Sequence, residues 1–272
     1  MHDEVGWRRG GELPAPVARL VAAPGRAERL LHVHTLPPRA AVTRPWPQWA
    51  APEVVAAFGR AGVVLPWAHQ VEAAEAAHGG EHVALATGTA SGKSLAYLLP
   101  ALTDVVAGAG EPSGRGATML YIAPTKALAA DQLAALEALD VPGVRAAVYD
   151  GDTSPVDRRW AREHAGVVLT NPDMIHHALL PGHPRWSGFL RALRYVVVDE
   201  AHHYRGVFGS NVALVLRRLR RIAARYRSEP TFVLASATTG DPGGTARALA
   251  GLHARVVTAD ASPRSGTYVA LW

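Results

Sequence analysis

Cysteine is absent from the 272 residues of the chain. Its absence excludes a disulfide framework, a zinc site with thiolate ligands and a cysteine nucleophile, and it favours a reduced, cytoplasmic setting. Long apolar runs are also missing, since none reaches the ~18 residues that cross a bilayer, and the first twenty residues lack the apolar segment of a secretory signal. Apolar residues still make up 49% of the chain, enough for the core of a folded domain.

Lysine is scarce, because only Lys93 and Lys126 are lysines among the 28 cationic residues. In a chain rich in arginine, a retained lysine marks a place where a compact ammonium group is required and a planar guanidinium will not serve. The formal net charge is +5. A mildly basic domain is compatible with an acidic polymer as partner and equally with a soluble domain that has no such partner.

Prolines recur throughout residues 1–48, so we expect an irregular N-terminal arm there. Between residues 49 and 259, short apolar runs alternate with stretches of helical periodicity. Strands that are apolar throughout and alternate with helices predict an α/β domain in which helices cover both faces of a mainly parallel sheet of about seven strands. The expected strands are 82–86, 118–123, 144–149, 167–170, 195–199, 231–236 and 254–258.

A loop of small residues follows the first expected strand of this domain and leads into a helical pattern. A strand, a tight loop and a helix N-terminus together bind phosphate, because backbone N–H groups and the positive helix end face the anion. In such a loop Lys93 would reach the β- and γ-phosphates and Ser94 would ligate Mg²⁺, whereas the alternative is a serine that opens a plain core helix. Thr87 replaces the first glycine of the G-x-x-x-x-G-K-[ST] pattern. The expected phosphate loop consists of Thr87, Gly88, Thr89, Ala90, Ser91, Gly92, Lys93 and Ser94.

A second apolar run, at 195–199, ends in the adjacent acids Asp199 and Glu200. A carboxylate at the end of a buried strand beside a phosphate loop can hold Mg²⁺, and the neighbouring acid can orient or deprotonate an attacking water. We therefore assign Asp199 to the metal and Glu200 to the general base. Two acids at this place are otherwise common as a helix start, where they complement the helix dipole. Parallel strands would bring these acids to the same sheet edge as the phosphate loop.

Several segments resemble, in the same order, the motifs of superfamily 2 DEAD/DEAH-box helicases. Asp199-Glu200-Ala201-His202 is similar to the DEAH box of that family, and Ser236-Ala237-Thr238 resembles its motif III. Residues 123–128 and 170–173 resemble motifs Ia and Ib, and Trp67-Ala68-His69-Gln70 resembles the segment that reads adenine. Each pattern is weak alone, and their common order makes the resemblance specific.

The resemblance implies ATP and Mg²⁺ as cofactors, and it implies a nucleic acid, DNA more than RNA, as the partner. The residues implied in catalysis are Lys93, Asp199, Glu200 and His202. The residues implied in nucleotide binding, besides the phosphate loop, are Trp67 and Gln70. The residues implied in coupling hydrolysis to strand binding are Ser236, Ala237 and Thr238. The residues implied in contacts to the strand backbone are Pro124, Thr125, Lys126, Gly151, Thr170, Asn171 and Pro172, although Thr125 and Thr170 have helix capping as an alternative.

Within the family, the segments TASGKSLAY and DEAHHYRGVFGSNVALVLRRLRR are similar to the bacterial YprA or mitomycin-repair-factor type of helicase, which implies a role in DNA repair. The resemblance covers about residues 33–272. The family uses two RecA-like domains with ATP between them, and no motif of a second domain follows motif III in this sequence. We therefore expect a first RecA-like, three-layer P-loop domain at 49–259, and the start of a linker to a missing second domain at 260–272.

Other functions stay open from the sequence. One is an isolated nucleotide- and strand-binding module with little turnover, because an arginine finger contributes ~10³ or more to the rate elsewhere. Another is a different P-loop DNA translocase subunit. An arginine cluster at 217–225 is expected to be the solvated face of an amphipathic helix, with a second strand-binding surface as the alternative. The histidines have no metal-binding spacing, and adjacent histidines are expected to point apart.

Overall fold

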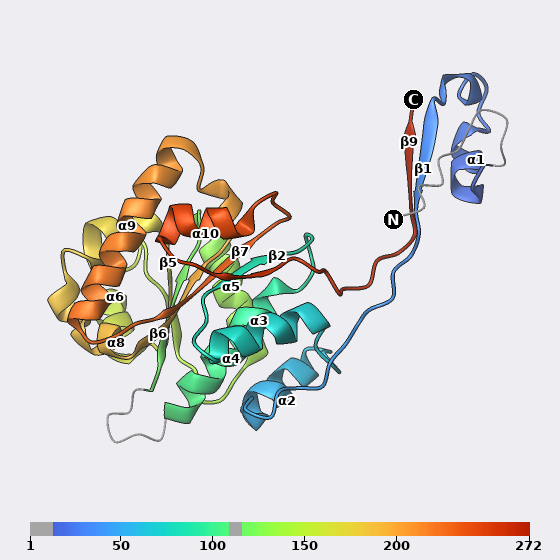
Figure 1. Ribbon diagram of the computed structural model, residues 1–272. Helices are drawn as coiled ribbons and strands as arrows, with labels where there is room; N and C mark the ends of the chain where they lie inside the picture. Colours follow the sequence, from blue (N-terminus) through green and yellow to red (C-terminus); the bar gives the residue numbers. More distant parts are fainter. Residues whose placement is uncertain (1–12, 109–115) are drawn as a thin grey trace. The chain divides into compact units, whose positions relative to one another are not determined.

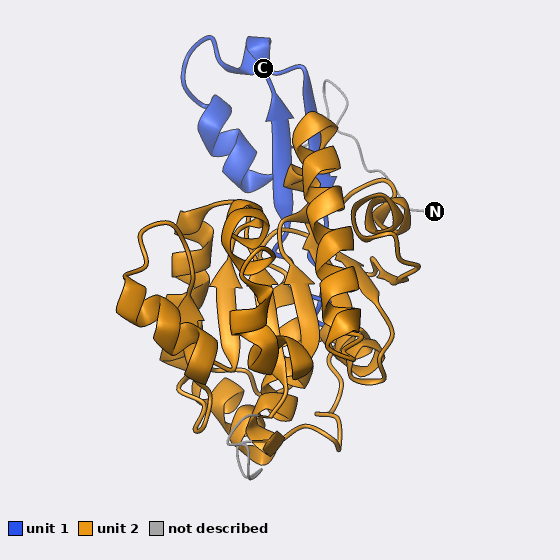
Figure 2. Ribbon diagram, turned by 90° about the vertical axis from the view of Figure 1, so that its left-hand side faces the viewer, with its two compact units in different colours: residues 1–42, 261–272 blue, residues 43–260 orange. Residues whose placement is uncertain are grey.

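The computed structural model describes residues 13–108 and 116–272 of the chain. The chain forms two compact units, one that combines residues 1–42 with 261–272 and one that comprises 43–260 (Figure 2). Residues 1–12 of the expected N-terminal arm lie outside the described part. The larger unit contains all the motifs that the sequence singled out.

Seven strands form one sheet in the larger unit (Figure 1). These strands are β2 (Val83–Ala86), β3 (Thr118–Ile122), β4 (Ala146–Val148), β5 (Val167–Thr170), β6 (Leu193–Val198), β7 (Thr231–Ser236) and β8 (Arg255–Val257). Their order is β4-β5-β3-β6-β7-β2-β8, and every neighbouring pair is parallel. This architecture confirms the predicted α/β fold. In β2, β3, β5 and β7 every residue is buried, as a sheet covered on both faces requires.

Helices surround this sheet in Figure 1. The helices of the larger unit are α2 (Pro52–Arg60), α3 (Ala68–His78), α4 (Lys93–Ala107), α5 (Lys126–Leu139), α6 (Pro155–His164), α7 (Pro172–Met174), α8 (Ser187–Arg191), α9 (Gly206–Arg225) and α10 (Pro242–Ala250). Short helical turns are η3 (Ile175–Leu179), η4 (His183–Trp186) and η5 (Ala201–His203). Among the described helices, none combines the length and the apolar composition needed to span a bilayer.

Alternate residues of the strands enter two separate hydrophobic cores. On β7, Val233 and Ala235 belong to one core, whereas Phe232 and Leu234 belong to the other. The first core also contains residues of α2, α3, α4 and α5, and the second contains residues of α6, α8, α9 and α10. Since side chains of a strand alternate between faces, the two cores identify the two helical layers and confirm the three-layer arrangement.

Three helices of the larger unit begin in the same way. A polar residue accepts a hydrogen bond from a backbone N–H of the first turn, and a proline follows it as the first helical residue. The polar side chain satisfies an otherwise unpaired donor, and proline costs nothing at a position whose N–H has no helical partner. The pairs are Ser154-Pro155, Asn171-Pro172 and Asp241-Pro242.

The smaller unit contains regular structure where the proline spacing predicts an irregular arm. Helix α1 (Ala15–Val21) begins directly after Pro14, so proline here starts a helix instead of preventing one. Strand β1 (His32–Leu36) pairs antiparallel with β9 (Thr267–Leu271). The expectation of an irregular segment is wrong for these residues, and the tail expected as a linker start at 260–272 contributes a strand. Pairing between opposite ends of a sequence leaves no local signal.

Candidate functional site

All the predicted motifs lie at one edge of the sheet. Because the strands are parallel, their carboxyl ends share this edge. Strand β2 leads directly into Thr87, β3 into Ala123 and β6 into Asp199, while β5 ends at Thr170 and β7 at Ser236. The topology thus brings together loops that are far apart in the sequence, as the order of the motifs predicts.

The phosphate loop is closed by its own lysine and hydroxyl groups. Nζ of Lys93 donates to the carbonyl oxygens of Thr87 and Gly88, over 3.3 Å and 2.9 Å. The hydroxyls of Thr87 and Ser91 lie 2.6 Å apart and are buried. Ala90 has a φ of 61°, a left-handed conformation that costs a residue with a side chain about 1 kcal/mol. Thr87 therefore holds the loop through a hydroxyl where other loops of this kind have glycine.

Gly92 is the point where helix α3 reaches the phosphate loop. Its φ is 62°, and a Cβ there would lie 2.5 Å from Nε2 of Gln70. This Nε2 donates to the Gly92 carbonyl over 2.8 Å, while Oε1 of Gln70 accepts from the backbone N–H of Trp67 over 2.7 Å. The buried His69 adds a contact of 2.9 Å from Nε2 to the Ser91 carbonyl oxygen, a link that the sequence did not single out.

An apolar cavity of about 590 Å³ opens beside these residues. Trp67, Gln70, Gly92 and Ser94 line it on the side of the phosphate loop, and Leu98 of α4 is part of its apolar lining. A flat apolar ring with a few polar edges suits such a cavity, because apolar walls provide burial and the few polar groups set the orientation.

Both carboxylate oxygens of Asp199 accept a hydrogen bond. Oδ1 accepts from the backbone N–H of Glu200 over 2.8 Å, and Oδ2 accepts from the hydroxyl of Tyr121. Burial raises the pKa of Asp199, and these two hydrogen bonds together with the Lys93 ammonium oppose the rise. Lys93 and Asp199 thus lie close enough to act on each other electrostatically. The φ of Glu200 is 47°, so the backbone turns sharply directly after the strand.

Two tyrosines link the residues predicted to hold the metal. The hydroxyl of Tyr97, on α4, donates to Oγ of Ser94 over 3.2 Å, while Tyr121, on β3, donates to Asp199. Burial and the charge of Asp199 raise the pKa of both phenols, so they stay protonated as donors. The sequence analysis missed both. An inward position of Tyr121 follows from its apolar strand, but its partner depends on β3 lying beside β6.

His202 lies between the acid pair and motif III. Its Nδ1 is 3.1 Å from a carboxylate oxygen of Glu200 and 3.3 Å from Oγ of Ser236. The predicted contact with motif III is therefore made through Ser236. Thr238 is exposed and forms no hydrogen bond with His202 in the part of the chain that the structure describes, and Ala237 has no polar side chain to offer.

Adjacent histidines do not point apart, contrary to the expectation from the sequence. The ring centroids of His202 and His203 are 4.4 Å apart, and those of His176 and His177 are 4.5 Å apart. These pairs lie in the turns η5 and η3, where the spacing of a regular helix or strand does not apply. One ligand atom each of Glu200, His202 and His203 also lies within 4.8 Å of the others, a grouping that the sequence did not predict.

Motif Ia places Lys126 on the surface. Its Nζ donates to Oδ2 of Asp152 over 2.6 Å, and both side chains are exposed. A Cβ on Gly151 would lie 3.4 Å from the same Nζ, so Gly151 and Lys126 are neighbours. Oγ1 of Thr125 accepts from the backbone N–H of Leu128 at the start of α5, which is the capping alternative named above, and Pro124 precedes it half-buried.

Motif Ib is more enclosed than motif Ia. The hydroxyl of Thr170 donates to the carbonyl of Tyr149 over 2.6 Å, and Thr170 is only 2% exposed. Oδ1 of Asn171 accepts from the backbone N–H of Met174, which caps α7, and Pro172 is buried behind it. The geometry therefore uses the Thr170 side chain inside the domain and leaves Asn171 half-buried at the edge.

The family follows from a comparison with known proteins. Residues 67–243 match the model of the DEAD/DEAH box helicase family. The chain belongs to this family. The match spans the phosphate loop, the acid pair and motif III, and it confirms the resemblance predicted from these motifs.

Individual relatives support the narrower resemblance. The chain is 41% identical over 239 residues to the uncharacterized ATP-dependent helicase YprA of Bacillus subtilis, which covers 87% of this chain and 31% of YprA. It is 37% identical over 268 residues to the ATP-dependent helicase HRQ1 of Saccharomyces cerevisiae, covering 96% of this chain and 24% of HRQ1. The crystal structure of the DUF1998 helicase MrfA bound to DNA and AMPPNP matches with a TM-score of 0.82 and 38% identity, over 89% of this chain and 34% of MrfA. The chain thus spans about a third or less of the length of these proteins.

Proposed function

We propose that this chain is the first RecA-like motor domain of an ATP-dependent DNA helicase. The observation that carries the proposal is the convergence of Lys93 and Ser94 with Asp199 and Glu200 at one sheet edge. Similarity to proteins named ATP-dependent helicases supports ATP, and similarity to a helicase bound to DNA supports DNA. We also propose DNA repair as its setting, as the resemblance of the sequence implies. We take residues 49–259 as this domain, and we place the start of the connection to a second RecA-like domain in 260–272, although Thr267–Leu271 form strand β9. We keep the cytoplasm as its location.

The residues at this edge fit a magnesium–triphosphate group. The Ser94 hydroxyl and the Asp199 carboxylate are hard oxygen ligands of the kind that Mg²⁺ prefers, and we assign them to the ion. Burial raises the pKa of Asp199, and a bound cation would lower it again, because a nearby positive charge favours the charged carboxylate. When bound, the ion would neutralise negative charge on the phosphate oxygens. Tyr97 and Tyr121 would hold the two ligands in place.

Lys93 and Glu200 have separate tasks in this proposal. Lys93 donates to two loop carbonyls, and we assign its ammonium to the β- and γ-phosphates, which are better acceptors than carbonyl oxygens. Glu200 is half-buried beside Asp199, and we assign it to orienting the attacking water and taking its proton. His202 contacts both Glu200 and Ser236, and it would link hydrolysis to motif III.

The apolar cavity beside the loop supports a site for the base. We assign Trp67 to contact with the adenine ring and Gln70 to its polar edge. Gln70 is also bonded to Gly92 of the phosphate loop, so a base seated in the cavity would act on the loop through one side chain. The arrangement supports binding of the base and of the phosphates as one coupled event.

We assign binding of the nucleic-acid strand to the residues at the surface of motifs Ia and Ib. Lys126 is held by the single exposed carboxylate of Asp152, an ion pair that a phosphate could replace at little cost. We assign Lys126, Gly151 and Asn171 to the strand backbone, with Pro124, Thr125 and Pro172 shaping the loops that present them. Thr170 supports motif Ib from inside. Contacts of this kind carry no sequence information, as a translocating motor requires.

The test uses the 272-residue chain and a fluorescent ATP analogue. Binding of the analogue should require Mg²⁺. A single-stranded DNA oligonucleotide should also bind to the chain. Lys126→Ala should lower the affinity for DNA and leave the affinity for the nucleotide unchanged. RNA of the same length should bind more weakly than DNA. Absence of nucleotide binding contradicts the ATP assignment, and equal or tighter binding of RNA contradicts the DNA assignment.

A second measurement addresses turnover. We expect the chain alone to hydrolyse ATP slowly and to displace no strand, because the family places part of the ATP site on a second domain. A strand-displacement assay with a fluorescent duplex measures this directly. Robust unwinding by the 272 residues would show that the chain needs no second domain.

A further inference from the structure

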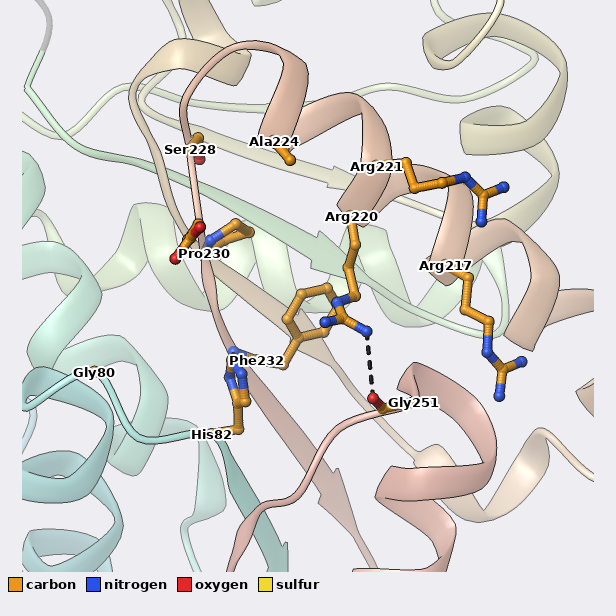
Figure 3. Close-up of a pocket in the computed structure, with 11 residues that line it drawn as sticks. Gly80, His82, Arg217, Arg220, Arg221, Ala224, Ser228, Pro230, Phe232 and Gly251 are labelled. Atoms are coloured by element: carbon orange, nitrogen blue, oxygen red, sulfur yellow. Dashed lines mark hydrogen bonds between the residues drawn. The ribbon is translucent and has the colours of Figure 1, made fainter.

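A second cavity, of about 660 Å³, lies at the amino edge of the sheet (Figure 3). It is lined by His82, which precedes β2, by Pro230, which precedes β7, by residues of α9, and by Gly251 after α10. Because the strands are parallel, this edge is the opposite one from the edge that carries the phosphate loop. The cavity is therefore separate from the nucleotide site.

Three arginines of α9 line this cavity. Arg220 and Arg221 follow Arg217 by three and four positions, so both lie on the same side of the helix as Arg217. Nη2 of Arg217 donates to the Ala248 carbonyl over 3.0 Å, and Nη1 of Arg220 donates to the Ala250 carbonyl over 2.9 Å. A guanidinium has five N–H groups. Nη1 of Arg220 also donates to the Gly251 carbonyl over 3.3 Å. These bonds fix two guanidinium groups in place and leave most of their donors without a partner among the described residues.

The charge of the cavity is unbalanced. Arg221 is exposed and forms no hydrogen bond or ion pair with any residue in 13–108 or 116–272. Glu229 is the single carboxylate among the lining residues, and within the same ranges it forms no ion pair with the arginines. Three guanidinium groups against one carboxylate leave an excess of positive charge around the opening.

His82 adds a further donor. Its Nδ1 accepts a hydrogen bond from the backbone N–H of Phe232 over 3.1 Å. Burial and the neighbouring Arg220 lower the pKa of His82, so the ring is neutral at neutral pH and its proton is on Nε2. Phe232 and Pro230 are themselves buried, and no exposed large apolar side chain lines the cavity. The site offers hydrogen-bond donors and positive charge without an apolar anchor.

We propose that this cavity binds phosphate groups of a nucleic-acid backbone, as a second strand contact remote from the nucleotide site. Guanidinium groups match pairs of phosphate oxygens in geometry as well as in charge. An acidic protein segment is the competing occupant, but the lining offers no exposed aromatic or large apolar side chain to accompany its arginines as anchors of a protein interface. The inference goes beyond the proposed function, because it requires no nucleotide and none of the residues at the carboxyl edge.

The first experiment measures the affinity for a DNA oligonucleotide against salt concentration. Arg221→Ala should weaken binding and reduce the slope of log affinity against log salt by about 0.7 for single strands, or about 0.9 for a duplex. Arg191→Ala is the matched control, because Arg191 is also exposed, precedes β6 at the same edge and does not line the cavity. Arg221 has no hydrogen-bond or ion-pair partner among the described residues, so an unchanged thermal midpoint should accompany the loss.

The second experiment places a reporter in the cavity itself. The chain has no cysteine, so Ala224→Cys, at an exposed lining position, provides a unique thiol for an environment-sensitive fluorophore. The same label at Ala56→Cys, on α2, is the control. We expect the oligonucleotide to change fluorescence at residue 224 and not at 56, and we expect Arg221→Glu to abolish the change.

The outcomes separate the occupants. A response to the oligonucleotide at concentrations far below those needed with tripolyphosphate or polyglutamate supports a nucleic-acid site. A response to tripolyphosphate alone assigns the cavity to free phosphates, and a stronger response to polyglutamate assigns it to an acidic protein segment; both overturn the proposal. Equal effects of the Arg221 and Arg191 variants overturn it as well. Lys126→Ala should leave the signal at residue 224 unchanged, so failure of the proposed strand site is distinguishable.

Discussion

At the carboxyl edge of the sheet, Lys93 belongs to one short loop and Asp199 and Glu200 to another, and each loop directly follows a buried strand. At the amino edge, the arginine-lined cavity combines His82 with Arg220 and with residues after helix α10. The polar groups of the first site approach one another because parallel strands end there. Those of the second meet only because α9 and α10 pack side by side. Motif-built sites can therefore be found in a sequence, whereas helix-packing sites cannot.

The largest expected effect is on turnover. Glu200→Gln should lower ATP hydrolysis by about 10³-fold, since general-base catalysis contributes 10²–10⁴-fold, while affinity for a fluorescent ATP analogue is kept. Glu81→Gln, at the amino edge, should leave turnover unchanged. Single-turnover phosphate release measures both variants. If Glu200→Gln keeps the turnover of the unmodified chain, the assignment of Glu200 as the general base is wrong.

The next effect is on nucleotide affinity. Lys93→Ala should weaken binding of the ATP analogue by about 10²-fold, because the contact between the half-buried ammonium and the phosphates is lost. Arg191→Ala removes a cation from the opposite edge and should not change this affinity. Equilibrium fluorescence titration compares the two. Equal losses in both variants would mean that net charge, and not the loop, determines binding.

A smaller effect tests the tyrosine that the sequence did not reveal. Tyr121→Phe removes the donor to Asp199 and should raise the Mg²⁺ concentration for half-maximal analogue binding by about tenfold, the value of one hydrogen bond to a charged group. Tyr195→Phe is the control, because its hydroxyl donates to Asp104 instead. Isothermal titration at several Mg²⁺ concentrations gives the shift. No shift with Tyr121→Phe would reduce this tyrosine to a packing role.

The smallest effect concerns the amino edge and pH. Burial lowers the pKa of His82 in the folded state below its ordinary value of 6.5. The unfolded chain therefore binds more protons in the window below 6.5, so the stability contributed by neutral His82 is present above that pH and is lost as pH falls. His82→Asn, whose Oδ1 can still accept from Phe232, should flatten this dependence. Urea midpoints of the unmodified chain and of His82→Asn, measured at about pH 7.5 and about pH 5.5, test this prediction. An equal change of the midpoint with pH in both proteins would contradict it.

Much of the fold could be predicted because its signals are local. The apolar runs predict the seven strands. Strands β2 and β3 lie within their expected segments, and β7 coincides with its expected segment. The proline-rich start is the counterexample, since α1 and β1 form there. Pro14 lies at a helix start, which proline tolerates, and β1 needs a partner from the other end of the chain. Composition alone predicts neither the helix that starts after Pro14 nor the pairing of β1 with β9.

The sequence by itself determined the family and the carboxyl-edge motifs. Each motif is a contiguous segment after an apolar strand, and a parallel sheet sends all such segments to one edge. Only the tertiary structure decided that Tyr121 reaches Asp199, that Thr170 turns inward, and that arginines of α9 surround a cavity with His82. These contacts depend on strand order and helix packing, which bring together residues whose separation in the sequence gives no periodic or local signal.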